Sequence, residues 1–243
     1  MAQVLVAGEF GGKGELPTAR QLESELPADW TIICNKQLVS PAGGSREIDL
    51  IILASNVVFV VEEKSWRGNI FGNDNGWVLR SGESYPSPVN TVEMLSKRIA
   101  GYLRDAIPAL KQNQVQHFVY ARVILSADDA KCAVRDQRIP IVVLRLAEAA
   151  EELRRFDKLH AGPQSIGPHR KAILDRLTGL TDKPKVPRVV GMFEVTESLP
   201  GYGVIRVLRA RHADGSERIL KLVQPPTTLD LSLIHISEPT RLR

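Results

Sequence analysis

Two carboxylates and a lysine lie within or directly after two neighbouring apolar segments of this sequence. The segments 48–54 and 57–61 are joined by Ser55-Asn56, which is the strongest hairpin signal in the chain. A two-residue turn at that point pairs residues whose numbers sum to 111, so Asp49 is predicted to lie opposite Glu62. Side chains alternate along a strand, so Lys64 is expected on the face of Glu62.

Such a group has a definite chemistry. Two carboxylates held close together repel each other and lose hydration unless a cation lies between them or one takes a proton. Few, hard oxygen ligands suit Mg²⁺ or Mn²⁺, which accept waters and phosphate oxygens at their other positions. The metal would polarise a phosphodiester and activate water, while Lys64 would orient that water or stabilise phosphoryl charge. The alternative interpretation is that these charges only mark where two buried strands reach solvent.

The elements expected around this hairpin give an α/β chain. Apolar residues spaced by three and four predict a first helix over residues 15–26 and a second one that Pro88 opens, with the stripe Val92, Leu95, Ile99 and Leu103. A strand is expected over 30–39 and a loop over 41–45. The stretch 68–87 is interpreted as a loop with short strands possible at 69–71 and 77–80. Further strands are expected at 118–125 and 139–144, and further helices at 147–156 and 170–177.

Four short stretches resemble the nuclease-related domain family, a branch of the PD-(D/E)xK nuclease superfamily. They are Gly14-Glu15, Leu26-Pro27, the Arg-Glu-Ile-Asp stretch 46–49 and the Val-Glu-Glu-Lys-Ser-Trp-Arg-Gly stretch 61–68, within a resemblance that covers about residues 15–103. The resemblance implies a restriction-endonuclease-like core, in which a helix, a three-stranded antiparallel meander, a second helix and further strands follow one another. It implies metal-dependent hydrolysis of nucleic acid.

The resemblance also assigns residues. The catalytic set is Glu15, Asp49, Glu62 and Lys64, and the metal ligands are Asp49, Glu62, Glu15 and the backbone carbonyl of Glu63. Family members often carry glutamine on the second helix after a proline, where this chain has Pro88-Val-Asn90.

Several other acidic residues compete with these positions. Glu9, Glu23 and Glu25 are alternatives to Glu15, but Glu9 precedes a glycine-rich stretch and the other two lie off the helix stripe. Glu47 is two residues from Asp49 and is interpreted either as a surface residue or as a supporting acid.

A second, incomplete domain is expected after a proline-containing linker. The predicted domains are 1–180, a linker 181–190, a β-rich fragment 191–230 and a tail 231–243. The fragment has strands expected at 193–197, 204–210 and 218–223 with a turn at Asp214-Gly215, and it resembles the first strands of a protein-kinase N-lobe. The resemblance matches Lys221 to the lysine that contacts ATP, with ATP expected only in a full-length kinase-like domain.

The match in this fragment is partial, because Gly201 and Gly203 are out of step with the family's glycine loop. Residues 231–241 resemble translated sequencing-adapter sequence, so the natural gene is expected to continue beyond Asp230.

Bulk properties set the remaining expectations. The chain has 243 residues, a net charge of +4 and a pI near 9.1, which permits binding to DNA, with RNA as an alternative partner. Two cysteines without a metal-ligand pattern and no export or membrane-spanning segment indicate a cytoplasmic protein that does not bind membranes. The alternative function is a non-catalytic nucleic-acid-binding or sensing module that regulates an attached serine/threonine kinase-like domain. The oligomeric state is not predicted.

Overall fold

The computed structural model separates into two compact units. The first comprises residues 1–38 and 47–183, and the second comprises residues 39–46 and 184–243. The structure describes residues 1–6, 14–39, 45–112, 115, 117–163, 165–182, 189–199, 205–223 and 234–237.

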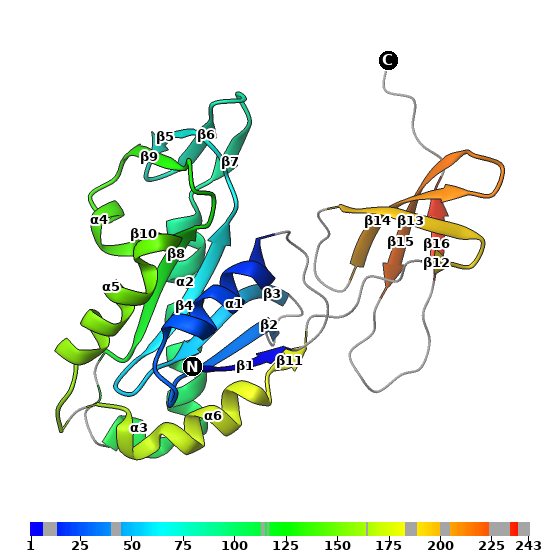
Figure 1. Ribbon diagram of the computed structural model, residues 1–243. Helices are drawn as coiled ribbons and strands as arrows, with labels where there is room; N and C mark the ends of the chain where they lie inside the picture. The colour runs from blue at the N-terminus through cyan, green and yellow to red at the C-terminus, as the bar shows by residue number, and fades with distance from the viewer. Residues whose placement is uncertain are drawn as a thin grey trace. The chain divides into compact units, whose positions relative to one another are not determined.

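The first unit is built on a mixed seven-stranded sheet (Figure 1). Its strands are β1 (Gln3–Val6), β2 (Thr31–Val39), β3 (Ser45–Leu53), β4 (Val58–Lys64), β8 (Val119–Leu125), β10 (Val143–Arg145) and β11 (Thr181–Asp182). The order is β1-β2-β3-β4-β8-β10, and β11 pairs with β2. β3 and β4 are antiparallel, whereas β4 with β8 and β8 with β10 are parallel. The predicted α/β class is confirmed, and β2, β3 and β4 are neighbours in chain order.

Helices cover both faces of this sheet, which explains why its central strands are apolar at odd and even positions alike. Leu50 and Phe59 lie on one face with residues of α1 (Glu15–Glu25) and α5 (Leu146–Leu159). Ile51 and Val60 lie on the other face with residues of α2 (Pro88–Ala106) and α6 (Arg170–Thr178). The predicted stripe of α2 is buried throughout. Three short helices complete the unit: α3 (Pro108–Gln112), α4 (Ile139–Val142) and η1 (Gly167–His169).

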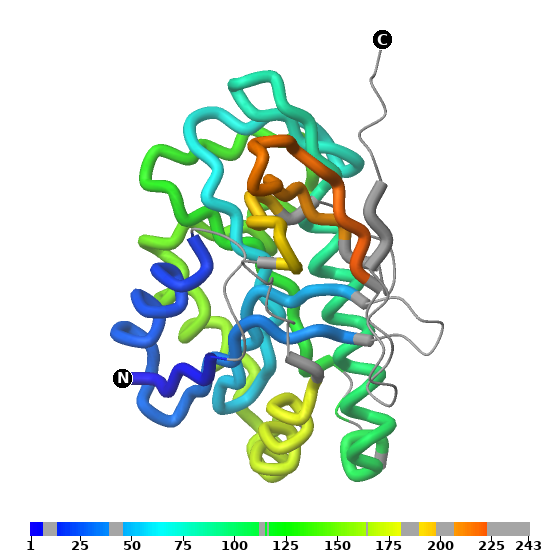
Figure 2. Tube along the Cα trace, turned by 90° about the vertical axis from the view of Figure 1, so that its right-hand side faces the viewer, coloured from blue at the N-terminus to red at the C-terminus, as the bar shows by residue number. Residues whose placement is uncertain are grey.

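A second, four-stranded sheet lies at one end of the same unit, as Figures 1 and 2 both show. Its order is β7-β6-β5-β9, with β5 (Asn69–Asn73), β6 (Gly76–Leu79), β7 (Ser84–Pro86) and β9 (Lys131–Arg135). The short strands expected within 68–87 are therefore present. They are parts of a sheet because β9, more than fifty residues further along the chain, pairs in parallel with β5.

Two sequence expectations are wrong in detail. Residues 139–144 do not form one strand, because Pro140 lies in the first turn of α4 and β10 begins only at Val143. Proline is favoured in the first turn of a helix, and a short apolar run does not distinguish the two structures. Residues 181 and 182 are not linker but form β11 against Gln37 and Lys36 of β2.

The second unit contains a five-stranded antiparallel sheet. Its strands are β12 (Val189–Val190), β13 (Phe193–Leu199), β14 (Ile205–His212), β15 (Glu217–Val223) and β16 (Ile234–Ser237). The turn between β14 and β15 contains Asp214 and Gly215, and Gly215 has φ +84°, as a tight hairpin favours. β16 belongs to the tail 231–243 and pairs with β15. In the described part of the chain, no helix has the length and apolarity that a membrane crossing needs.

Candidate active site

The β3–β4 hairpin has the predicted register. The amide of Ala54 donates to the carbonyl of Val57 at 3.0 Å and closes the two-residue turn. The pairs continue to Leu50–Val61, and their numbers sum to 111 as expected. One step further, the backbone N–H of Glu63 donates to Oδ2 of Asp49 at 2.8 Å. The Asp49 carboxylate thus accepts a backbone hydrogen bond at the point where the two strands separate.

Asp49, Glu62 and Lys64 form one electrostatic group. Nζ of Lys64 lies 2.8 Å from Oε1 of Glu62 and donates to the carbonyl oxygen of Glu63 at 2.9 Å. Burial, and then repulsion from Glu62, raise the pKa of Asp49 to about 8, against the opposing effect of Lys64. Burial alone would lower the pKa of Lys64, but Glu62 and Asp49 outweigh it and the pKa is raised. The positive charge of Lys64 therefore interacts with two carboxylates, those of Glu62 and Asp49.

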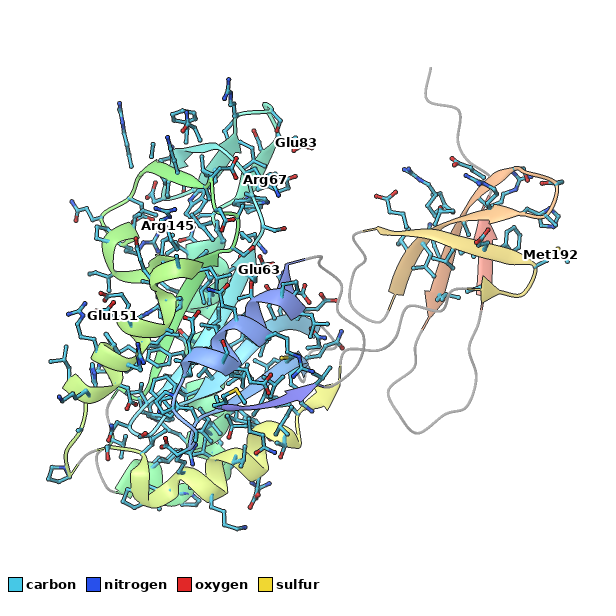
Figure 3. All side chains as sticks on the ribbon, in the orientation of Figure 1. Glu63, Arg67, Glu83, Arg145, Glu151 and Met192 are labelled. Carbon is cyan, nitrogen blue, oxygen red and sulfur yellow. The ribbon has the colours of Figure 1, made fainter. Side chains whose placement is uncertain are left out.

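Glu15 approaches from the other side of β4. It is 7% exposed and lies on the α1 stripe that also buries Ala19 and Leu22. Glu63 points to the same side, where its buried carboxylate accepts a hydrogen bond from Ser126, and Figure 3 places it beside α1. Burial is the main cause that raises the pKa of Glu63. Glu15 contributes to the raised pKa of both Glu63 and Asp49, so it is within electrostatic reach of each.

Gly14 fits closely against the Glu63 carboxylate. A Cβ atom at Gly14 would collide with both of its oxygens. We expect Gly14→Ala to lower the free energy of unfolding by about 1–3 kcal/mol in urea denaturation, because the buried carboxylate has to move. The same change in a Glu63→Ala background should cost much less, since the colliding atoms are gone. An equal loss in both backgrounds would contradict this explanation.

An open pocket of about 170 Å³ lies beside Glu62 and Lys64, and it is lined in addition by Trp66, Tyr85, Pro86, Pro88 and Thr91. The rings of Trp66 and Tyr85 stack with centroids 4.9 Å apart, and Nζ of Lys64 lies 5.9 Å from the Trp66 ring centroid. Tyr85 and Thr91 were not among the residues predicted for the site. Pro88, the first residue of α2, was the available signal, because it sets where the helix begins and hence which first-turn residues face the hairpin.

Asn90 does not line this pocket. Its side-chain amide donates to the carbonyl of Asp74 at 2.7 Å, so it holds the β5–β6 turn. Pro88 and Thr91 are the residues of α2 that line the pocket together with Glu62 and Lys64.

The other sequence candidates lie away from this group or cannot be placed. Glu47 is exposed on β3, and Glu9 lies outside the described residues. Lys221 is exposed on β15 of the second unit, where it pairs with Val207, while Gly201 and Gly203 lie outside the described residues. Across the described ranges, no three histidine, cysteine, aspartate or glutamate side chains are grouped so that they could hold a metal ion.

Comparisons with known proteins indicate a family for the first unit. Residues 10–126 match the model of a family described as the nuclease-related domain. The chain is also similar to an uncharacterized protein of Bacillus anthracis, with 27% identity over 105 residues, which are 41% of this chain and 50% of that protein. The chain thus spans about half the length of this curated relative. No solved structure matches this chain. The family match supports placing residues 10–126 of this chain in the nuclease-related domain family, whose name suggests a nuclease-like function.

Proposed function

We propose that the first unit hydrolyses phosphodiester bonds of nucleic acid with the help of a divalent metal ion. The observation that carries the proposal is the group of Asp49, Glu62 and Lys64 at the point where β3 and β4 separate, beside an open pocket. Two carboxylates and an ammonium group are the residue types that this chemistry needs. The match of residues 10–126 to the nuclease-related domain supports the same reaction class.

The donor set of the site suits a hard cation. Asp49 is a partly buried carboxylate whose pKa is raised to about 8 by loss of hydration and by Glu62, so additional positive charge there would stabilise its ionised form. The ammonium group of Lys64 contacts an oxygen of Glu62 and the carbonyl oxygen of Glu63, which are two oxygens that a cation would use. We propose Asp49, Glu62 and the Glu63 carbonyl as ligands of Mg²⁺ or Mn²⁺, with Glu15 as a further carboxylate nearby.

Each residue then has a separate task. A bound Mg²⁺ ion would supply charge neutralisation at the phosphate and acidify a water molecule. Lys64, released from Glu62 when that carboxylate binds the ion, is placed to donate hydrogen bonds to phosphoryl oxygens in the pocket. Trp66 and Tyr85 line the pocket next to it and would hold the sugar or base beside the phosphate.

Incubation of the full chain with plasmid and linear DNA in Mg²⁺, Mn²⁺ or EDTA tests this proposal. We expect cleavage in either metal, none in EDTA, and a loss of at least about 100-fold in Glu62→Ala and Lys64→Ala. Glu47→Ala is the matched control, because Glu47 is an exposed acid on the same hairpin. Cleavage that survives in both site variants would refute the assignment of the site.

A second candidate function is nucleic-acid binding without hydrolysis, coupled to a kinase-like domain. It is supported by the antiparallel order β13-β14-β15 in the second unit, with Lys221 on the third of these strands. We propose that this unit is the first part of a kinase-like N-lobe and that ATP contact at Lys221 needs further parts of such a domain. DNA retention without cleavage in the same incubation would favour this candidate.

A further inference from the structure

The four-stranded sheet of the first unit has one face packed on the core and one face in solvent. Exposure alternates residue by residue along β5, β6 and β9. Phe71 is 48% exposed, and it pairs with Val78 on β6 and with Ala133 on β9. Because directly paired residues share a face, these three side chains form an apolar row across the sheet with an aromatic ring at its centre.

Two cations lie on the same face beside this row. Lys131 and Arg135 are exposed and stand on β9 two residues before and two residues after Ala133. Neither has an ion pair with any residue in the described ranges. The four strands contain no aspartate or glutamate at all. Within the strands, the exposed charges on the side of Phe71 are therefore positive, and the nearest exposed acids, Asp74, Glu83, Asp128 and Asp129, lie in the flanking turns.

An exposed ring beside cations is the combination that binds single-stranded nucleic acids. An unpaired base stacks on the aromatic side chain, and the cations contact the phosphates. Lys131 and Arg135 are four residues apart, or roughly 13 Å along a strand. This exceeds the roughly 3.4 Å rise per phosphate on one strand of a duplex, so the two cations would contact different phosphates.

The opposite face of the same sheet, on which Trp77 is buried and Tyr85 is 37% exposed, leads to the candidate site. Trp77 of β6 and Tyr85 of β7 pair with each other, and both rings contact Trp66, whose centroid lies 5.9 Å from that of Trp77. Trp66, Tyr85 and Pro86 line the pocket beside Lys64. A nucleic-acid strand bound on the outer face would therefore lie on the same small sheet whose opposite face forms one wall of the pocket.

We propose that the outer face of this sheet, with Phe71 at its centre and Lys131 and Arg135 beside it, binds unpaired nucleotides and directs the protein to single-stranded nucleic acid. The link to cleavage rests on the proposed function, whereas the binding itself does not. In a duplex the base faces are stacked on one another, so the Phe71 ring would gain little from it.

Binding of labelled oligonucleotides of about 12 nucleotides to the full chain in EDTA tests the inference without any hydrolysis. The ligands are single-stranded DNA, single-stranded RNA and a DNA duplex, followed by fluorescence anisotropy. We expect the single strand to bind more tightly than the duplex. Phe71→Ala should weaken single-strand binding by roughly 5- to 100-fold and leave duplex binding nearly unchanged.

Two conservative variants separate stacking from general apolar contact. Phe71→Trp should keep the affinity, and Phe71→Leu should lose it nearly as far as the alanine variant does. Lys131→Ala and Arg135→Ala should each reduce the salt dependence of binding by about one unit of slope, unlike Lys158→Ala on α5. Unchanged binding in Phe71→Ala, full affinity in Phe71→Leu, or a preference for duplex would overturn the inference.

The cleavage assay in Mg²⁺ distinguishes the two proposals. If DNA is not cut but binding depends on Phe71, hydrolysis is refuted and the binding face stands. If DNA is cut and Phe71→Ala binds every ligand as the unaltered chain does, only the binding face is refuted.

Discussion

Asp49→Asn is expected to reduce metal-dependent cleavage by at least about 100-fold and at the same time to stabilise the metal-free protein. The loss follows because asparagine removes the charge that a divalent ion would need, while its shape stays nearly the same. The gain follows because Asp49 is a partly buried carboxylate that has lost hydration and that Glu62 repels. Asparagine can still accept the hydrogen bond from the Glu63 amide, so the end of the hairpin should be kept.

The gain in stability should depend on pH in a definite direction. An aspartate has a pKa of about 3.9 in an unfolded chain, whereas the pKa of Asp49 in the folded chain is raised to about 8. The folded state therefore binds the proton more tightly, and this contribution to stability is complete below about pH 4 and lost as the pH rises through about 8. Above that range Asp49→Asn should raise Tm by roughly 2–8 °C in EDTA, and near pH 4 it should change Tm little.

Thermal unfolding of both proteins in EDTA and in Mg²⁺, at pH 4 to 9, measures this effect. Mg²⁺ should raise the Tm of the unaltered chain and not that of Asp49→Asn, because an ion that binds only the folded state stabilises it. Glu47→Gln changes an exposed acid on the same strand and should leave Tm and its pH dependence unchanged. A lower Tm for Asp49→Asn at pH 8 in EDTA would contradict the raised pKa.

The hairpin that carries this site was predictable because local signals define it. Ser55-Asn56 fixes the turn, and the apolar runs on either side fix the faces, so the register followed from counting. The faces of Glu62 and Lys64 then followed from strand alternation alone. The α2 stripe was predictable for the same reason, since its period of three and four residues survives in the packed helix.

The parts that were missed depend on contacts between distant segments. Nothing local in residues 131–135 indicates that they pair with β5, and only that pairing turns residues 69–86 into a sheet with two distinct faces. The wall that Tyr85 gives to the pocket has the same origin. Likewise, sequence spacing cannot show that Glu15 and Glu63 share one side of β4 while Asp49 and Glu62 belong to the other group, because that depends on how α1 packs.

Asp157→Ala is expected to destabilise the protein strongly, because Asp157 makes a long-range contact of this kind with the β3–β4 turn. Asp157 is 5% exposed and lies near the end of α5, a hundred residues beyond the hairpin turn that it holds. Its carboxylate accepts hydrogen bonds from the Asn56 amide at 2.7 Å, the Asn56 side chain at 2.9 Å and the Val57 amide at 3.2 Å. Alanine would leave these donors unpaired, which should lower the free energy of unfolding by about 2–4 kcal/mol.

Urea denaturation of Asp157→Ala, Asp157→Asn and Asp175→Ala measures this contribution. Asp157→Asn keeps one carbonyl acceptor and should lose less than the alanine variant, while Asp175 is an exposed carboxylate paired with Lys171 and its loss should stay within about 0.5 kcal/mol. The turn lies at the end of the β3–β4 hairpin remote from Asp49 and Glu62. Cleavage by Asp157→Ala at low temperature, where it remains folded, should therefore equal that of the unaltered chain. Reduced cleavage by fully folded Asp157→Ala would mean that the turn also sets the register on which the two carboxylates depend.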